Sequence, residues 1–366
     1  MIKNDRGGVA DVLLVALFAG ALLAPAADSQ FFHISSKLAS TENRNMASKP
    51  LLRFKNFEEA KDFPKAYETY FNDNFGFRNL LVRAGSRFKL FYMKISPVPL
   101  VIVGKNGWYY YYGDRGYDGV PVAGYRGITR YSEKNLELIK RNLESQKKWL
   151  EDQGIRYVIL IAPSKATIYP EYMPDTIQVV NRQSRTDQLV DYLEKTNAGM
   201  RVLDVREELR RAKKNYPVYY KTDHHWNRYG AFLAAQAITR ELGKYFPGVE
   251  PFSIDDYEVT VEKLNAETDL SNLLAMPKQL DDDEVLLEFK PKSLKTAFSY
   301  RRPYPKILFF RESFGNALLP FLQDHFKNIV DRRWEAIGLL DYGVVTQLKP
   351  DAVVVEIEES YQGALQ

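Results

Sequence analysis

The sequence predicts an α/β fold in which helices cover both faces of a parallel sheet, giving three layers. Two observations carry this prediction. Predominantly apolar runs, typical of strands buried on both faces, occur at 157–162, 306–310 and 351–357. Helical patterns of apolar residues lie between these runs, and strands separated by helices favour parallel pairing. The chain has 366 residues, enough to bury such a core without disulfides.

Each element has its own local signal. Ahead of the sheet, the pattern predicts helices over 57–74 and 78–94, broken at Gly76, and then a β-hairpin. The hairpin is expected around Asn106 and Gly107, because Asn-Gly tolerates the positive φ angles of a tight turn. The weaker pattern of 255–304 indicates an insertion or edge elements. The other expected elements are helices over 132–153, 186–196, 207–215, 228–245 and 316–326, and a short strand over 201–205.

Composition and charge exclude several kinds of site. The chain has 51 basic and 47 acidic residues, and because the two signs are interleaved, a nucleic-acid-binding surface is not expected. It has no cysteine, so disulfides, thiolate metal sites and cysteine nucleophiles are excluded. The sequence has no glycine-rich phosphate loop of the P-loop type, and we predict no cofactor.

The N-terminus has the features of an export signal. Lys3 and Arg6 precede an uncharged apolar run over 12–24, and small residues follow at 25–27. The broader run over 9–27 is nearly long enough to span a bilayer. We therefore expect an extracytoplasmic protein, periplasmic or at the cell surface. Its predicted parts are a signal peptide or membrane anchor over 1–27, a linker over 28–56 and a catalytic domain over 57–366.

Ser313 is the first candidate for chemistry, because it lies between a predicted buried strand and a predicted helix. A serine at that junction sits at the carboxyl edge of the sheet, where open α/β folds bind ligands. Gly315 lets the backbone approach a substrate closely, and the N–H groups of Ser313 and Gly315 are candidates for an oxyanion hole. The alternative is that Ser313 only caps the helix, as serines in this position usually do.

Asp223 and His225, in the string Thr-Asp-His-His-Trp, are the candidate acid and base. In an extended segment residues two apart face the same way, so these side chains are expected to lie together while His224 points elsewhere. A carboxylate beside an imidazole fixes its tautomer and stabilises the imidazolium, as a catalytic triad requires. The alternative is a pair of hydrogen-bonded loop histidines beside a buried Trp226.

A metal site is the rival interpretation of the same string. Asp223, His224 and His225 are ligand types that zinc and manganese accept. Metal-dependent phosphoesterases also need other clustered aspartates, and the acidic run over 281–284 is expected to be a solvated turn. We therefore favour the triad and predict no metal.

A further polar segment follows the first buried strand and is expected at the same edge of the sheet. Lys165 in this segment is a candidate contact for an anionic sugar or acyl donor, and Tyr169 is a second substrate-binding candidate. Asn316, next to Gly315, is a third. The alternative for Lys165 is a surface charge. Trp108 and the tyrosines at 109–112 either stack on sugar rings or pack in the core.

Together, these strings resemble the DHHW family of AlgJ- and AlgX-like proteins, whose catalytic domain is SGNH-hydrolase-like, a flavodoxin-like three-layer fold. The family usually has Asp before the serine, where this chain has Glu312, and this difference leaves the role of Glu312 open. The resemblance covers nearly all of the chain after the export segment, through the strings at 42–44, 70–78, 103–108, 163–165, 169–171, 223–226 and 313–321.

The resemblance implies a triad of Ser313, His225 and Asp223 in a polysaccharide O-acetyltransferase that works outside the cytoplasmic membrane. It also implies a partner, a membrane-bound O-acyltransferase that supplies acetyl groups. Two alternatives remain open. One is a carbohydrate acetyl esterase that uses the same residues with water as acceptor, and the other is a non-catalytic glycan-binding subunit of an exopolysaccharide export or modification complex.

Overall fold

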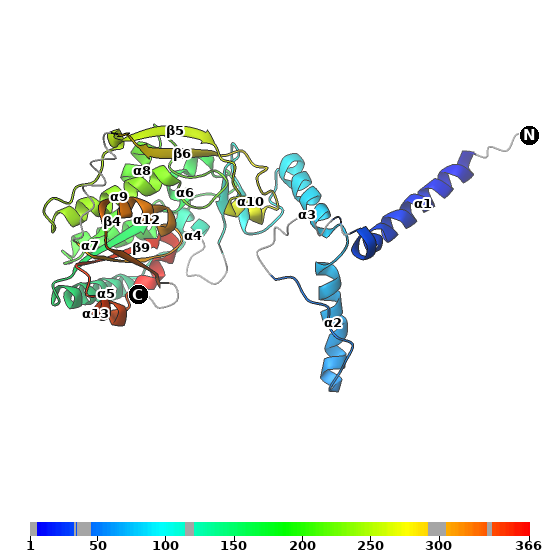
Figure 1. Ribbon diagram of the computed structural model, residues 1–366, viewed down its shortest axis with the longest axis horizontal. Helices are drawn as coiled ribbons and strands as arrows, with labels where there is room; N and C mark the ends of the chain where they lie inside the picture. Colours follow the sequence, from blue (N-terminus) through cyan, green and yellow to red (C-terminus); the bar gives the residue numbers. More distant parts are fainter. Residues whose placement is uncertain (1–5, 33, 35–44, 114–120, 292–304, 335–338) are drawn as a thin grey trace, which may run out of the picture. The chain divides into compact units, whose positions relative to one another are not determined.

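The computed structural model describes residues 6–32, 34, 45–113, 121–291, 305–334 and 339–366 (Figure 1). The chain forms two compact units. The smaller consists of Met1–Val98 with Asn272–Pro277, and the larger of Pro99–Ser271 with Lys278–Gln366. The string at 42–44, part of the family resemblance, lies outside the described residues.

A five-stranded parallel sheet forms the centre of the larger unit, with strand order β4-β3-β9-β7-β8. This confirms the predicted α/β class with a parallel sheet. The edge strand β8 was not predicted, because three of its five residues are charged and its sequence is not a buried apolar run. The strands are β3 (Arg156–Ala162), β4 (Val202–Asp204), β7 (Ile307–Arg311), β8 (Ile329–Arg333) and β9 (Ala352–Glu358).

Two separate cores cover the two faces of this sheet, because successive side chains along a strand point to opposite sides. In β9, for example, Val354 belongs to one core and Val353 and Val355 belong to the other. Helices α9 (Arg228–Gly243) and α12 (Gly315–His325) pack on the first face. The second face is covered by α5 (Glu133–Glu151), α7 (Arg185–Lys195) and α13 (Tyr342–Leu348). Figure 1 shows α9 and α12 on one side of β9 and α5 and α13 on the other.

The predicted helices and strands of the alternating part are all present, with bounds that differ by up to three residues. The hairpin is also confirmed: β1 (Val101–Val103) pairs antiparallel with β2 (Tyr109–Tyr111), and Asn106 and Gly107 have φ angles of 55° and 76°. The region with the weaker pattern contains an antiparallel pair, β5 (Tyr257–Lys263) and β6 (Asp283–Phe289), and residues 292–304 lie outside the described part. Among the described residues, this unit also has the short helices α4 (Pro121–Arg126), α6 (Lys165–Ile168) and α8 (Arg206–Ala212). A further short helix, α10 (Asp269–Leu273), has residues assigned to both units.

The smaller unit contains α1 (Arg6–Ala27), α2 (Phe57–Asp73) and α3 (Arg78–Arg87), which continues as the π-helix η3 (Phe88–Met93). The structure divides the units after Val98, and α2 buries no residue. The predicted catalytic domain over 57–366 stays a prediction. Within α1, residues Gly8–Ala27 are long and apolar enough to cross a membrane.

Candidate active site

Ser313 lies in the short turn between β7 and α12, at the carboxyl edge of the sheet. The loop that contains Asp223 and His225 precedes α9 and reaches the same edge. Asp223 Oδ1 accepts a hydrogen bond from His225 Nδ1 at 2.7 Å, and His225 Nε2 lies 2.9 Å from Ser313 Oγ. The structure therefore aligns an acid, an imidazole and a hydroxyl in the order that proton transfer from the hydroxyl requires.

The loop from Tyr219 to Asn227 is held closed by contacts within the larger unit. Tyr219 and Trp226 form an isolated β-bridge at its base. The indole Nε1 of the fully buried Trp226 donates to the carbonyl of Phe314 at 3.0 Å, which ties this loop directly to the nucleophile turn. Asn227 caps α9 by accepting from the Gly230 N–H. These contacts fix the His225 backbone relative to Ser313.

The charges around His225 set its protonation. Burial disfavours the imidazolium, but the hydrogen bond and charge of Asp223 outweigh burial and raise the pKa of His225, with smaller contributions from Asp269 and Glu312. For Asp223, burial is again opposed by the bond and charge of His225, and its pKa is lowered. The acid therefore stays ionised while the base titrates, as a general base in a triad must.

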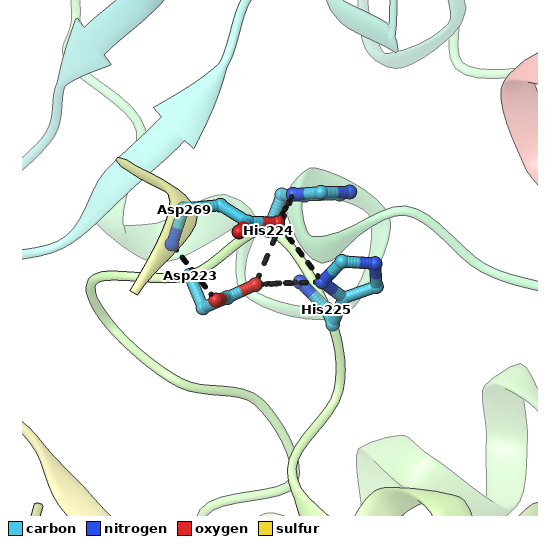
Figure 2. A group of neighbouring side chains, drawn as sticks. All are labelled: Asp223, His224, His225 and Asp269. Carbon is cyan, nitrogen blue, oxygen red and sulfur yellow. Dashed lines mark hydrogen bonds and ion pairs between the residues drawn. The ribbon is translucent and has the colours of Figure 1, made fainter. Parts of the chain in front are cut away.

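The sequence argument for the position of His224 was wrong. The segment is a tight loop and not an extended strand, and the His225 N–H folds back onto Asp223 Oδ1 at 3.0 Å. The His224 ring consequently stacks on His225, with centroids 3.7 Å apart, and its Nδ1 lies 3.2 Å from Asp269 Oδ2 (Figure 2). Asp223 and His225 still meet, but through a local turn.

Asp269 is a site residue that sequence reasoning missed. Its backbone N–H donates to Asp223 Oδ2 at 3.0 Å, so the second carboxylate oxygen of the acid is also held. Asp269 lies 46 positions from Asp223 in the chain, inside the region of weak pattern, and no local signal joins the two.

The rival metal interpretation has a geometric basis, because Asp223, His224, His225 and Asp269 offer ligand atoms within 4.8 Å of one another (Figure 2). An ion bound through His225 Nδ1 would replace the bond between that nitrogen and Asp223. Under the triad, we expect the rate of acyl-enzyme formation to be unchanged after dialysis against a chelator. A loss of this rate that zinc or manganese restores would instead support the metal site.

The acidic run over 281–284 is not the solvated turn that the sequence suggested. Asp282 is buried, with 3% of its surface exposed, and it accepts hydrogen bonds from the N–H groups of Lys221, Thr222 and Asp283 and from the Thr222 hydroxyl. It thereby anchors the loop just before Asp223. The neighbouring Asp281 is exposed and pairs only at the surface, with Lys263.

Replacing Asp282 by Ala is expected to lower the free energy of unfolding by about 2–4 kcal/mol, because buried backbone donors lose their acceptor. The matched control, Asp281→Ala, is expected to change this free energy by about 0.5 kcal/mol or less. Chemical denaturation of both variants measures the difference. Equal stabilities would contradict the anchoring role of Asp282.

Glu312 occupies one of the two amides that the sequence assigned to an oxyanion hole, that of Ser313, and also bonds the amide of Phe314. Its Oε2 accepts from the Ser313 N–H at 2.5 Å and from Ser313 Oγ at 2.7 Å, and its Oε1 accepts from the Phe314 N–H at 3.2 Å. The Ser313 N–H is therefore bonded in this structure, contrary to the expectation that it faces the substrate. Behind Glu312 lies Glu356, whose complete burial raises its pKa and favours the neutral acid.

The other predicted binding residues take structural positions. Lys165 is buried, and its Nζ donates to the carbonyls of Tyr220, Lys221 and Asp223. The three donors of the ammonium group thus have acceptors in the loop, although burial lowers the Lys165 pKa to about 7. Lys165 is not the surface charge considered from the sequence; it lines the pocket beside Ser313, and its role as a substrate contact stays a prediction.

Tyr169, Gly315 and Asn316 are placed differently from one another. The Tyr169 hydroxyl accepts from the Val218 N–H in the core, and its ring lies 4.2 Å from that of Trp108, so these aromatics pack together. Gly315 begins α12, beside Ser313. Asn316 is exposed and accepts a hydrogen bond from Arg311 through Oδ1. The geometry favours a structural role for Tyr169.

A pocket opens beside Ser313 at the ends of β3, β7 and β9. Its wall includes Tyr111, His224, Glu312 and Glu358. Tyr111 comes from the hairpin, as does Tyr110, so two of the aromatics considered for sugar stacking line the pocket. Burial raises the pKa of Glu358 to about 7, and its carboxyl accepts from the Ser164 hydroxyl at 3.0 Å.

The pH dependence of the acylation rate is expected to change when Asp269 loses its charge. A general base must be neutral, so the rate of acylation should fall as the pH decreases through the raised pKa of His225. Asp269→Asn removes a negative charge that raises this pKa, and we expect the midpoint of the pH–rate profile to move to lower pH. Glu267→Gln, a change at an exposed acid on the same segment, should leave the midpoint in place. Identical midpoints in all three proteins would contradict the assigned base.

Comparison with known proteins shows which family this chain belongs to. The model described as "SGNH hydrolase-like domain, acetyltransferase AlgX" matches residues 101–299, which is more than half of the chain. The chain belongs to this family. The matched segment includes Asp223 and His225 and ends before Ser313. Membership confirms the predicted AlgJ/AlgX-like resemblance and, with the parallel sheet, the SGNH-hydrolase-like fold.

This chain also matches curated relatives. "Probable alginate O-acetylase AlgJ" of Pseudomonas syringae pv. tomato is 30% identical over 227 residues, 59% of this chain and 54% of the relative. The protein of the same name from Pseudomonas aeruginosa is 27% identical over 180 residues, which are 48% of this chain and 41% of the relative. The chain therefore aligns with about half the length of these relatives.

Two solved structures are also similar. The O-acetyltransferase domain of Pseudomonas putida AlgJ has a TM-score of 0.45 and 20% identity, covering 73% of this chain and 93% of that one. Bacillus cereus PatB1 with a sulfonyl adduct has a TM-score of 0.48 and 18% identity, covering 71% and 96%.

Proposed function

We propose that this protein is a serine-dependent O-acetyltransferase that acetylates hydroxyl groups of an extracellular polysaccharide. The observation that carries the proposal is the alignment of Asp223, His225 and Ser313, with contacts of 2.7 and 2.9 Å. Membership of the AlgX family and the printed name of the AlgJ relatives support acetyl transfer to a polysaccharide. The apolar helix α1 supports a location outside the cytoplasm.

In the first step, Ser313 Oγ attacks the carbonyl carbon of an acetyl donor while His225 Nε2 takes the hydroxyl proton. The tetrahedral intermediate collapses, the bond to the leaving group breaks, and His225 returns the proton to that group. Ser313 Oγ lies within hydrogen-bonding distance of both His225 Nε2 and Glu312 Oε2, and the hydroxyl has only one proton. The proton must therefore point to His225 when the reaction starts.

The Glu312 carboxylate must leave the backbone N–H groups that it binds before they can bind the substrate oxygen in the same step. Its carboxylate oxygens accept from the N–H groups of Ser313 and Phe314, which belong to the turn that carries the reacting oxygen. We propose that the acetyl oxygen displaces Glu312 there, so that these amides and the N-terminus of α12 stabilise the developing negative charge.

In the second step, a sugar hydroxyl attacks the carbonyl carbon of the acetyl-serine and gives its proton to His225 Nε2. The bond between Ser313 Oγ and the acetyl carbon then breaks, and the acetylated sugar is released. Ser313 Oγ regains the proton and the enzyme is restored. A membrane-bound O-acyltransferase is the proposed source of the acetyl group, as the family resemblance implies.

Product analysis tests the direction of transfer. The protein is incubated with an activated acetyl ester and an oligosaccharide, and acetylated sugar and free acetate are quantified. Acetyl groups on the sugar are expected above the level found with Ser313→Ala. Free acetate alone would establish an esterase, and glycan binding without any acetyl-enzyme would establish a non-catalytic subunit.

A further inference from the structure

The segment from Arg78 to Met93, α3 with η3, has a side that the protein leaves uncovered. Phe88 and Tyr92 are 57% and 81% exposed, and their rings stack with centroids 5.7 Å apart. Leu80 and Phe91 are also large apolar residues with more than a third of their surface exposed. Exposed apolar side chains that gather on one side of a helix mark an interaction surface more often than chance scatter does.

The spacing of these residues shows that they share one face. Leu80, Ala84 and Phe88 follow one another at intervals of four along α3, and the Tyr92 ring stacks on Phe88 in the π-helical turn that follows. The opposite face is turned inward, since Ser86 and Leu90 are 5% and 2% exposed. The helix is therefore seated on one side and presents an apolar stripe on the other.

The charge of the segment matches a negatively charged surface. Residues 78–94 include five basic side chains and no Asp or Glu: Arg78, Arg83, Arg87, Lys89 and Lys94. Arg87, Lys89 and Lys94 are exposed, whereas Arg78 and Arg83 are half-buried. Exposed basic side chains near an apolar stripe can reach lipid headgroups. By contrast, α2 has five acidic residues and two lysines, so the basic character belongs to this segment and not to the whole unit.

The position of the segment in the fold ties it to the membrane helix. Asp28, immediately after α1, is fully buried, and its Oδ2 accepts a hydrogen bond from the N–H of Phe77, the residue before α3. Gly76 packs so closely on the carbonyl of Pro25 that a Cβ at this position would clash. The end of a helix that can span a bilayer therefore lies directly against the start of α3.

We propose that Arg78–Met93 lies in the interface of an anionic lipid bilayer, with Leu80, Phe88 and Tyr92 inserted among the lipids and the basic residues at the headgroups. A basic amphipathic helix binds such a surface through its apolar area and its charge together. The proposal includes retention of α1 as an anchor, because its C-terminal end contacts the start of α3 through Pro25 and Asp28. This inference does not rest on acyl transfer and survives if Ser313 proves inert.

The chain has no cysteine, so a single introduced cysteine can be labelled site-specifically. The full chain is reconstituted through α1 in nanodiscs, with an environment-sensitive fluorophore on Tyr92→Cys or, as a matched control, on Lys148→Cys, an exposed position of α5. In anionic nanodiscs, the probe at 92 is expected to shift to shorter emission wavelength and to be quenched by lipids with a nitroxide near the headgroup. The probe at 148 should do neither, and both variants should keep the wild-type melting temperature.

Charge dependence completes the test. Adding Lys89→Glu with Lys94→Glu, or replacing anionic by zwitterionic lipid, is expected to reduce the quenching at 92, because the electrostatic part of the attraction is lost. A blue shift at 92 without lipid quenching would show that a protein surface covers this face, and would overturn the proposal. Equal emission and quenching at 92 and 148 would also overturn it.

Discussion

Replacing Ser313 by Ala is expected to lower the rate of acetyl transfer from an activated acetyl ester by on the order of 10⁴-fold. The variant lacks the oxygen that lies 2.9 Å from His225 Nε2, so no covalent acetyl-enzyme can form at this position. Stopped-flow or steady-state release of the ester's leaving group measures the loss. The change removes one oxygen from a half-buried side chain, and little effect on folding is expected.

Ser360→Ala is the matched control, because Ser360 lines the same pocket and is another hydroxyl within it. We expect this variant to keep most of the transfer rate. If Ser313→Ala retained the wild-type rate while Ser360→Ala lost it, the nucleophile would have been assigned to the wrong serine.

The second large effect is expected at His225. His225→Gln keeps a polar side chain of similar size but removes the base, and the transfer rate should fall by on the order of 10⁴-fold. Asp223 would also lose its bonded partner, so the acid cannot compensate. The same leaving-group assay applies, together with mass spectrometry of the intact protein to detect residual acetyl-enzyme.

The adjacent histidine provides the control for this prediction. His224 stacks on His225 and lines the pocket, yet its Nδ1 lies beside Asp269, and no bond from it to Ser313 is found within the described residues. His224→Gln is expected to reduce the rate by less than about 10-fold, as for a residue outside proton transfer. Comparable losses in the two variants would point to the metal interpretation, in which both imidazoles are ligands.

Much of this fold was predictable from local patterns. The buried strands β3, β7 and β9 are apolar runs, and the turn of the β1–β2 hairpin follows from Asn106 and Gly107, whose φ angles are both positive. Ser313 was predictable as a candidate because a strand end and a helix start flank it in the sequence. These features depend on neighbours in the chain.

The features that were missed depend on contacts between distant segments. Asp269 and Asp282 support the Asp223 loop from 46 and about 60 positions away. No local signal marks Asp269, and the acidic run around Asp282 indicated a solvated turn and not a buried acceptor. Lys165 was predicted as a substrate contact, with a surface charge as the alternative, and its bonds to three carbonyls could not be foreseen because these carbonyls come from another loop. The hydrogen bond from the Ser313 N–H to the Glu312 carboxylate could not be predicted from the sequence either, because a side chain one position away can point in several directions.

The central claim is that an acetyl group passes through Ser313, and peptide mapping of the trapped intermediate tests it most directly. The protein is mixed with an activated acetyl ester, quenched in acid within the first turnover, digested and examined by tandem mass spectrometry. The account predicts acetyl on Ser313 Oγ, which disappears when an oligosaccharide is added before the quench and reappears on the sugar. Acetyl transfer to the sugar without any acetyl on Ser313 at any time point would contradict it.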